Sequence, residues 1–186
     1  MSGRWTACWL LAGFLAAGAA RGAPADDVRI RVNGLLGSYR PVTVAEWRAL
    51  GPAAAPALEA VARDAGALPT RRARALAALG VVQASAAAPL VRQLATDRSV
   101  APLLRASAVD AAPGVLGPEA VRFLAPFLRD ADPVVRQRSA EALVASGAAG
   151  CRVLASEATG RSPGDPVLKA AAGCAGQRTD GAPSEH

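Results

Sequence analysis

Apolar side chains recur every three or four residues through most of this chain, the spacing that places them on one face of an α-helix. The stretch from Leu116 to Leu143 shows the pattern most clearly. Its two apolar groups are Val121, Leu124, Phe127 and Leu128, then Val134, Val135, Ala142 and Leu143. Between them, Asp132 offers a side chain to cap a new helix and Pro133 suits the first helical position. The stretch therefore predicts two helices joined by a sharp turn.

This two-helix pattern recurs at a fixed interval. The predicted first helices end in an aspartate, and these aspartates are evenly spaced along the chain, at Asp64, Asp97 and Asp130. The pattern of residues 132–136 recurs at residues 165–169, the same distance along the chain that separates successive aspartates. The predicted units cover about 50–82, 83–115, 116–148 and 149–176. Because a two-helix unit of this size cannot enclose a core alone, the units must stack. The sequence thus predicts an all-α, right-handed solenoid of about four two-helix repeats.

Residues 26–49 are expected to form a short helical cap before the first unit. Residues 28–39 fit two patterns, because Val28, Ile30 and Val32 alternate as in a strand while Val32 and Leu36 fit a helical face. The segment 43–46 is a capping box that predicts a short helix. This helix carries Trp47, which is expected in the core rather than as a binding hot spot. At the other end, the composition of 177–186 predicts a disordered tail.

The segment 1–25 is typical of a secretory signal. Arg4 precedes an uncharged, mostly apolar run, Trp5 to Ala20, and Ala23-Pro24-Ala25 fits a small-x-small cleavage pattern. An uncleaved membrane anchor is the alternative, but the run is shorter than the roughly 20 residues that span a bilayer. We therefore predict an exported protein, periplasmic or secreted, with no stable membrane insertion after cleavage.

Two cysteines, Cys151 and Cys174, remain after this predicted signal is removed. Exported proteins meet oxidising conditions, in which paired cysteines form disulfides. The two residues are equidistant from the turn at 160–165, so they should lie side by side in an antiparallel helical hairpin. We expect a disulfide between them, with two buried free thiols as the alternative.

The repeated residues resemble the HEAT repeats, in particular the short bacterial class named after phycobilisome lyases. The resemblance covers residues 50–176. It rests on the recurring aspartates, on the Asp-Pro-Val-Val-Arg turn at 132–136, and on small residues in the second helices, which are Ala75, Ala108, Ala142 and Ala175. The first two units depart from the family at 68–70 and 101–103, where the Asp-Pro-Val start is missing. The resemblance implies a partner-binding scaffold, although some members of the named class handle bilin chromophores.

A basic residue recurs near the start of each second helix, and we call this set the basic ladder: Arg72, Arg105, Arg136 and Lys169. A ladder could bind acidic ligands. We favour a structural role in which each arginine pairs with one of the turn aspartates Asp64, Asp97 or Asp130 and so joins one unit to the next. The remaining arginines, Arg71, Arg74 and Arg138, are the candidates for a surface that contacts a partner.

No catalytic, cofactor or metal site is predicted. The single histidine is His186, and the chain has no Gly-rich phosphate loop, nucleophile elbow or His-Glu-x-x-His motif. The formal net charge of +6 falls to +4 without the signal, and aromatic residues make up 4% of the chain, a composition that does not favour nucleic-acid binding. The predicted function is therefore non-catalytic protein–protein interaction. The alternatives are an auxiliary chromophore or cofactor lyase, or its regulator, and a nucleic-acid-binding helical repeat.

Overall fold

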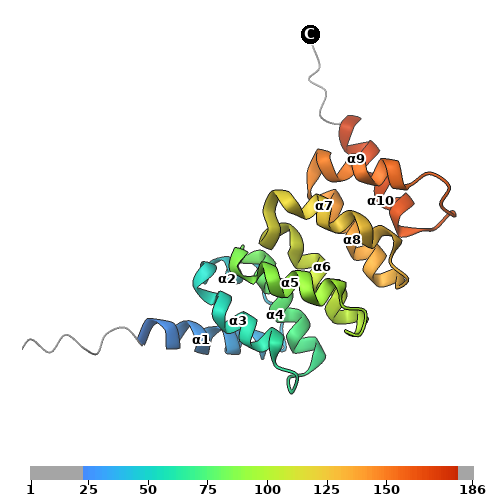
Figure 1. The fold of residues 1–186 in the computed structure, drawn as a ribbon. Helices are drawn as coiled ribbons and strands as arrows, with labels where there is room; N and C mark the ends of the chain where they lie inside the picture. The colour runs from blue at the N-terminus through green and yellow to red at the C-terminus, as the bar shows by residue number, and fades with distance from the viewer. Residues whose placement is uncertain (1–22, 180–186) are drawn as a thin grey trace, which may run out of the picture.

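The computed structural model describes residues 23–179, and within that range it contains helices and turns but no strand (Figure 1). The all-α prediction is therefore confirmed. The α-helices are α1 (Ala23–Leu36), α2 (Val44–Arg48), α3 (Ala55–Arg63), α4 (Pro69–Val81), α5 (Ala88–Thr96), α6 (Pro102–Leu116), α7 (Ala120–Leu124), α8 (Pro133–Ala145), α9 (Gly147–Glu157) and α10 (Pro166–Thr179). Four 3-10 segments are η1 (Gly51–Ala54), η2 (Ser85–Ala87), η3 (Gly117–Glu119) and η4 (Ala125–Arg129).

The first two helices cover one end of the molecule. α1 buries Val32 and Leu36 against the first helix pair, so the strand alternative for residues 28–39 is wrong. In α2 both hydrogen bonds of the capping box between Thr43 and Glu46 are present, and Trp47 is 7% exposed. Both predictions for this segment are confirmed. The predicted signal lies outside the described residues except for 23–25, which form the first turn of α1.

The remaining helices pack as successive antiparallel pairs. α3 packs on α4, α5 on α6, η4 on α8 and α9 on α10. The second helices of the pairs also contact one another in order, α4 with α6, α6 with α8 and α8 with α10. Each of these second helices begins with a proline at its first position, where the missing N–H is not needed: Pro69, Pro102, Pro133 and Pro166. The turns at 64–68, 97–101, 130–132 and 158–165 lie along one edge of the molecule (Figure 1).

The first helix of the third pair is not continuous. The sequence predicts one helix from Gly117, but the structure has η3, α7 and η4 in succession. Pro118 and Pro126 lack the N–H that an uninterrupted helix needs, so the backbone tightens into 3-10 turns on both sides of α7. Leu124 and Leu128 are nevertheless fully buried, as their spacing predicts.

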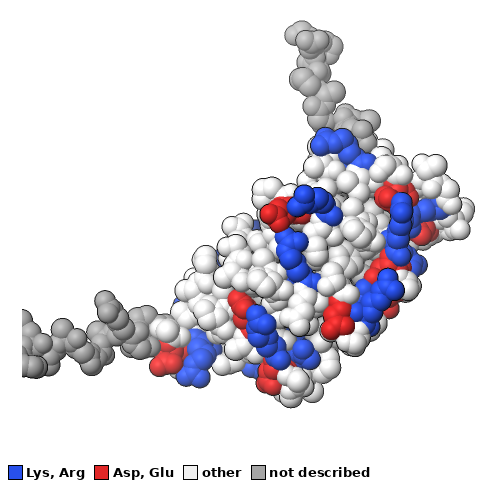
Figure 2. Space-filling view, viewed as in Figure 1, with Lys and Arg blue, Asp and Glu red and all other residues white. Residues whose placement is uncertain are grey.

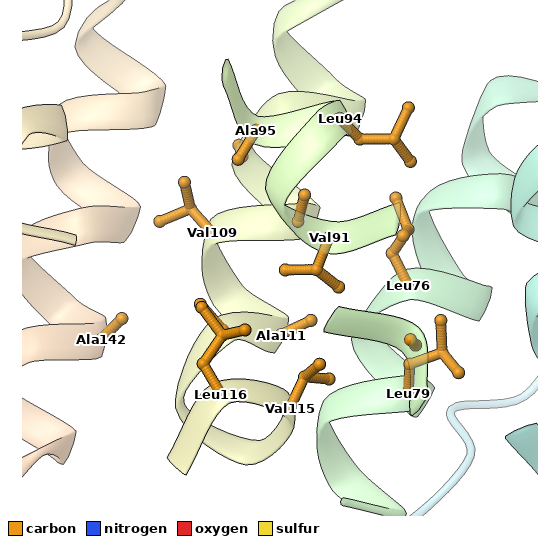
Figure 3. Packing of buried hydrophobic residues seen from close by; sticks show 14 of the residues in the cluster. Leu76, Leu79, Val91, Leu94, Ala95, Val109, Ala111, Val115, Leu116 and Ala142 are labelled. Carbon is orange, nitrogen blue, oxygen red and sulfur yellow. The ribbon is translucent and has the colours of Figure 1, made fainter. Parts of the chain in front are cut away.

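The second helices pack on one another through buried apolar side chains, both large and small (Figure 3). The small residues Ala75, Ala108 and Ala142 of these helices are buried. A Cβ atom added to Gly114 in α6 would lie 1.9 Å from the carbonyl oxygen of Gly80 in α4, so only glycine fits at this contact. Ala175, the corresponding small residue of the fourth unit, is exposed because α10 is the last helix of the described residues and this side chain lies on its outer face.

Candidate binding surface

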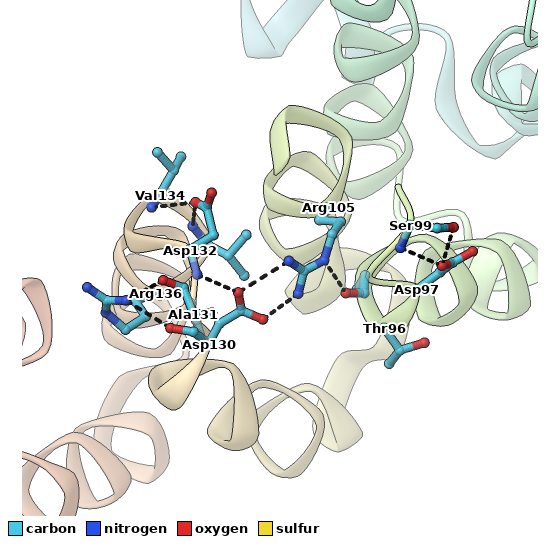
Figure 4. A network of polar contacts seen from close by, with 12 residues as sticks. Thr96, Asp97, Ser99, Arg105, Asp130, Ala131, Asp132, Val134 and Arg136 are labelled. Carbon is cyan, nitrogen blue, oxygen red and sulfur yellow. Dashed lines mark hydrogen bonds and ion pairs between the residues drawn. The ribbon is translucent and has the colours of Figure 1, made fainter. Parts of the chain in front are cut away.

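One ion pair of the basic ladder joins two helix pairs (Figure 4). Arg105 in α6 donates from Nε to the carbonyl oxygen of Ala95, 3.3 Å away in α5. Its guanidinium also binds Asp130, at the end of η4 in the next pair, with Nη1 3.2 Å from Oδ1 and Nη2 bonded to Oδ2. The two side chains are only 8% and 9% exposed. Arg105 therefore links its own turn to that of the next pair.

The surroundings of Asp130 favour its charged form. Burial opposes ionisation, but hydrogen bonds from Arg105 and from the Asp132 amide outweigh it and lower the pKa of Asp130. The Asp132 amide nitrogen lies 2.9 Å from Oδ1. Asp132 in turn accepts from the amides of Val134 and Val135 and caps α8, as predicted. The two aspartates of this turn thus bind Arg105, accept a backbone amide within the turn and cap the next helix.

The other ladder residues have no such pair. Arg72 donates to the Ala62 carbonyl at 3.0 Å, and Arg136 donates to the carbonyls of Asp130 and Ala131 at 2.8 and 3.1 Å. Neither these arginines nor Lys169 forms an ion pair with any residue from 23 to 179. The prediction that each arginine pairs with a turn aspartate is wrong for Arg72 and Arg136.

All three turn aspartates accept a hydrogen bond from an amide within their own turn, but only Asp130 also binds a ladder arginine among the described residues. Asp64 and Asp97 use their carboxylates within their own turns, accepting from the amides of Gly66 and Ser99 at 2.9 Å each. Ser99 also donates its hydroxyl to Asp97 at 2.6 Å. For Arg136, the fourth pair offers no equivalent aspartate, since α9 ends at Glu157 and is followed by Ala158.

Arg161 takes over part of the missing contact, and the sequence did not predict it. It donates from Nη2 to the Leu128 carbonyl at 3.0 Å, joining the fourth turn to the third pair. It also pairs with Glu157 and Asp165. Leu128 in the third unit corresponds to Ala95 in the second. Arg105 donates to the carbonyl of Ala95, so Arg161 makes the equivalent bond one unit later. No arginine occupies the position of Arg161 in the other units, so the repeat offered no signal for it.

The first two of the three arginines predicted to face a partner are engaged within the chain. Arg71 binds the side chain of Asn33 at 2.9 Å, and Arg74 binds the carbonyls of Leu36 and Ser38 at 3.3 and 3.1 Å. These contacts fasten the N-terminal cap to α4. The geometry therefore favours a structural role for both arginines.

The third, Arg138, joins α8 to α6. Its Nε lies 3.7 Å from Oδ2 of Asp110, and its Nη1 binds Glu141 at 2.9 Å. Burial between the helices raises the pKa of Asp110 to about 6, with Arg138 opposing this rise and Glu141 adding to it. The Asp110 side chain keeps 36% of its exposure, so water screens part of the effect.

The predicted disulfide is confirmed. Cys151 in α9 and Cys174 in α10 are bonded, with Cα atoms 5.6 Å apart and with 7% and 1% exposure. Gly150 allows the neighbouring contact, because a Cβ atom there would lie 1.9 Å from the Leu143 carbonyl oxygen. The bond holds α10 against α9.

An open groove lies between α8 and α10. It has a volume of about 720 Å³, and its walls include Val134, Val144 and Ala145 from α8, with Pro166 and Ala170 from α10. Val134 belongs to the predicted apolar side of its helix, but it is 48% exposed because it faces this groove. We refer to it as the α8–α10 groove. It is a concave apolar surface of the size that binds small molecules or a few side chains of a partner.

Charge on the molecular surface is interspersed. On the face drawn in Figure 2, basic and acidic side chains lie beside one another with uncharged surface between them. This face lacks the continuous basic patch typical of nucleic-acid binding. Within residues 23–179, no group of three His, Cys, Asp or Glu side chains could hold a metal ion. No helix in the described part of the chain is long and apolar enough to cross a membrane.

Comparisons with known proteins do not add a relative. No family model, curated protein or solved structure matches the chain. The turn network and the α8–α10 groove are therefore the features from which a function can be inferred.

Proposed function

We propose that the chain is an exported, HEAT-like α-solenoid of about four two-helix repeats that binds another protein and has no catalytic activity. The successive helix pairs, the parallel series α4, α6, α8 and α10, and the ion pair between Arg105 and Asp130 support the repeat architecture. The disulfide supports export, because such bonds persist in oxidising compartments. Stacked helix pairs commonly serve as extended binding surfaces.

The observation that carries the proposal is the α8–α10 groove. Most ionised side chains near the turns are engaged within the chain, whereas this groove leaves apolar side chains open to solvent. Val134 is the clearest example at 48% exposure. An open apolar surface of this kind, with polar groups at its rim, is typical of a protein interaction site.

Site-specific photo-crosslinking in the native host tests the proposal. A photoreactive amino acid in place of Val134 should give an adduct of one defined mass, identifiable by mass spectrometry. The same residue in place of Arg152, which is exposed on α9 outside the groove, is the matched control. Absence of any adduct at position 134 in a folded, disulfide-bonded protein would contradict a binding role for this surface.

Export is tested separately. The mature N-terminus should lie between Arg21 and Asp26, and the protein should be found outside the cytoplasm. N-terminal sequencing of the native protein checks this. Retention of Met1 on a cytoplasmic product would overturn the export proposal.

A further inference from the structure

We propose that the α8–α10 groove binds an apolar segment of the partner that carries a single carboxylate, and that this carboxylate pairs with Lys169. The inference rests on the proposed function and specifies the chemistry of the partner at this site. It is carried by two features of the groove: an apolar floor and one unbalanced positive charge.

The floor is suited to apolar side chains. Val134 is 48% exposed, and Val144 is half-buried and packed against the core behind it. Ala170 and Pro166 form the facing wall from α10. Covering such surface stabilises a complex by about 25 cal/mol for each Å² removed from water. The occupant must therefore present apolar side chains to gain affinity here.

Lys169 is the unbalanced charge. It lines the groove, and it forms no ion pair with any residue that the structure describes. The opposing charge, Glu141, is already engaged by Arg138 and by the amide of Gln137, both at 2.9 Å. Among the described residues, a ligand group at this groove therefore meets one ammonium that forms no ion pair and one carboxylate that is already hydrogen-bonded.

The helix ends at the groove add no further positive potential. Asp132 accepts from the Val134 amide at 2.8 Å, and Asp165 accepts from the Val167 amide at 2.8 Å, so both N-termini are capped by carboxylates. These caps offset the positive ends of the α8 and α10 dipoles. Lys169 alone thus selects the charge of the ligand.

A single carboxylate fits better than a phosphate. A phosphate monoester carries about −1.5 to −2 charge at pH 7, of which the single ammonium of Lys169 can balance about one. A phosphate would also lose more hydration over the apolar floor. The complementary segment therefore combines apolar residues with one aspartate or glutamate.

Charge-swapped peptides test the inference. Two short fluorescein-labelled peptides of leucine, alanine and glutamine differ in one central residue, glutamate or lysine. Fluorescence anisotropy with the full chain, its disulfide formed, should give about tenfold tighter binding of the glutamate peptide. Lys169→Glu should reverse this preference, which non-specific adsorption to an apolar surface would not do.

Three controls make the result specific. Arg152→Glu introduces the same charge outside the groove and should leave the preference unchanged. Val134→Asn should weaken binding of both peptides, because it places an uncharged polar group on the apolar floor. A third peptide with phosphoserine in the central position should bind less tightly than the glutamate peptide. All variants alter exposed residues, so their unfolding transitions should match the wild type.

Equal affinities for the two charge-swapped peptides, or a preference that persists in Lys169→Glu, would overturn the inference. Tighter binding of the phosphoserine peptide would overturn the choice of a carboxylate. These outcomes differ from failure of the proposed function, which is an absence of crosslinks from position 134. If crosslinks form there and their yield is unchanged by Lys169→Glu, the groove binds a partner by other chemistry.

Discussion

The second helix pair and the fourth are held by different interactions. Nine of the fifteen residues of α6 are buried, because α4, α5 and α8 all pack against it. α10 contacts only α8 and α9 among the described helices that pack closely on it. Of its residues 166–175, Val167 and Cys174 are buried. A helix with neighbours on several sides is stabilised by burial and by the Arg105–Asp130 pair. A helix at the end of the series lacks that burial, and a covalent bond to α9 compensates.

Breaking the ion pair in the middle should have the largest effect. Arg105→Met leaves the Asp130 carboxylate buried without its partner, so the free energy of unfolding should fall by about 4 kcal/mol. Urea denaturation at pH 7 measures it. Arg72→Met is the matched control, since Arg72 occupies the same ladder position but forms no ion pair, and it should cost about 1 kcal/mol. Equal losses in the two variants would contradict a special role for the Arg105–Asp130 pair.

Removing the covalent bond tests the other side of the comparison. Cys151→Ala with Cys174→Ala opens a link across 23 residues, and the free energy of unfolding should fall by about 3 kcal/mol. Hydrogen exchange should show the loss of protection concentrated in α9 and α10. Mass spectrometry of the oxidised wild type should show two hydrogens fewer than the dithiol form. Two freely alkylated thiols in the native protein would contradict the bond.

The close contact between α4 and α6 offers a smaller perturbation of the middle. Gly114→Ala places a Cβ atom 1.9 Å from the Gly80 carbonyl oxygen, so the helices must separate, at a cost of about 2 kcal/mol. Gly173→Ala in α10 is the control, because nothing lies within 4 Å of its added Cβ atom. That variant should stabilise the protein by up to about 1 kcal/mol through higher helix propensity. Thermal unfolding of both variants distinguishes a packed contact from a general effect of alanine.

The smallest expected effect concerns pH. Burial raises the pKa of Asp110 to about 6, above its value in the unfolded chain. The folded state therefore holds this proton more tightly, and the contribution to stability is complete below about pH 4 and is lost as pH rises through about 6. Because the side chain is partly exposed, the change should be below about 1 kcal/mol.

Asp110→Asn should remove this pH dependence between pH 4 and 7. Asp130 does not obscure the measurement, since its pKa is lowered and its contribution is lost only as pH falls below about 4. Urea denaturation at several pH values in this range is sufficient. An unchanged slope in Asp110→Asn would show that another group titrates.

Local signals in the sequence predicted much of this fold. The recurring aspartates and prolines identify the helix ends, and the capping box at Thr43 and Glu46 is present as predicted. Equal spacing of Cys151 and Cys174 about their turn correctly predicts the disulfide. These features depend on neighbours in the chain or on the symmetry of one hairpin, so periodicity is enough to find them.

The errors arise where packing depends on the next helix pair. The ladder prediction fails at Arg136 because the fourth pair lacks an aspartate at the end of its first helix. The groove itself was not predicted. Val134 has the helical spacing of a core residue, and only the position of α10 relative to α8 leaves it open. A one-dimensional pattern does not contain the distance between helices of two successive units.

The burial of the disulfide also makes it a reporter of local motion. With Cys151 and Cys174 at 7% and 1% exposure, a reductant reaches the sulfur atoms only when α9 and α10 separate. At low thiol concentration, the observed rate constant of reduction is then the product of two quantities. These are the equilibrium constant for separation of α9 from α10 and the rate constant of thiol–disulfide exchange in the open state. A ligand that bridges α8 and α10 would slow this reaction, so the reduction half-life reads out occupancy of the groove without any label on the partner.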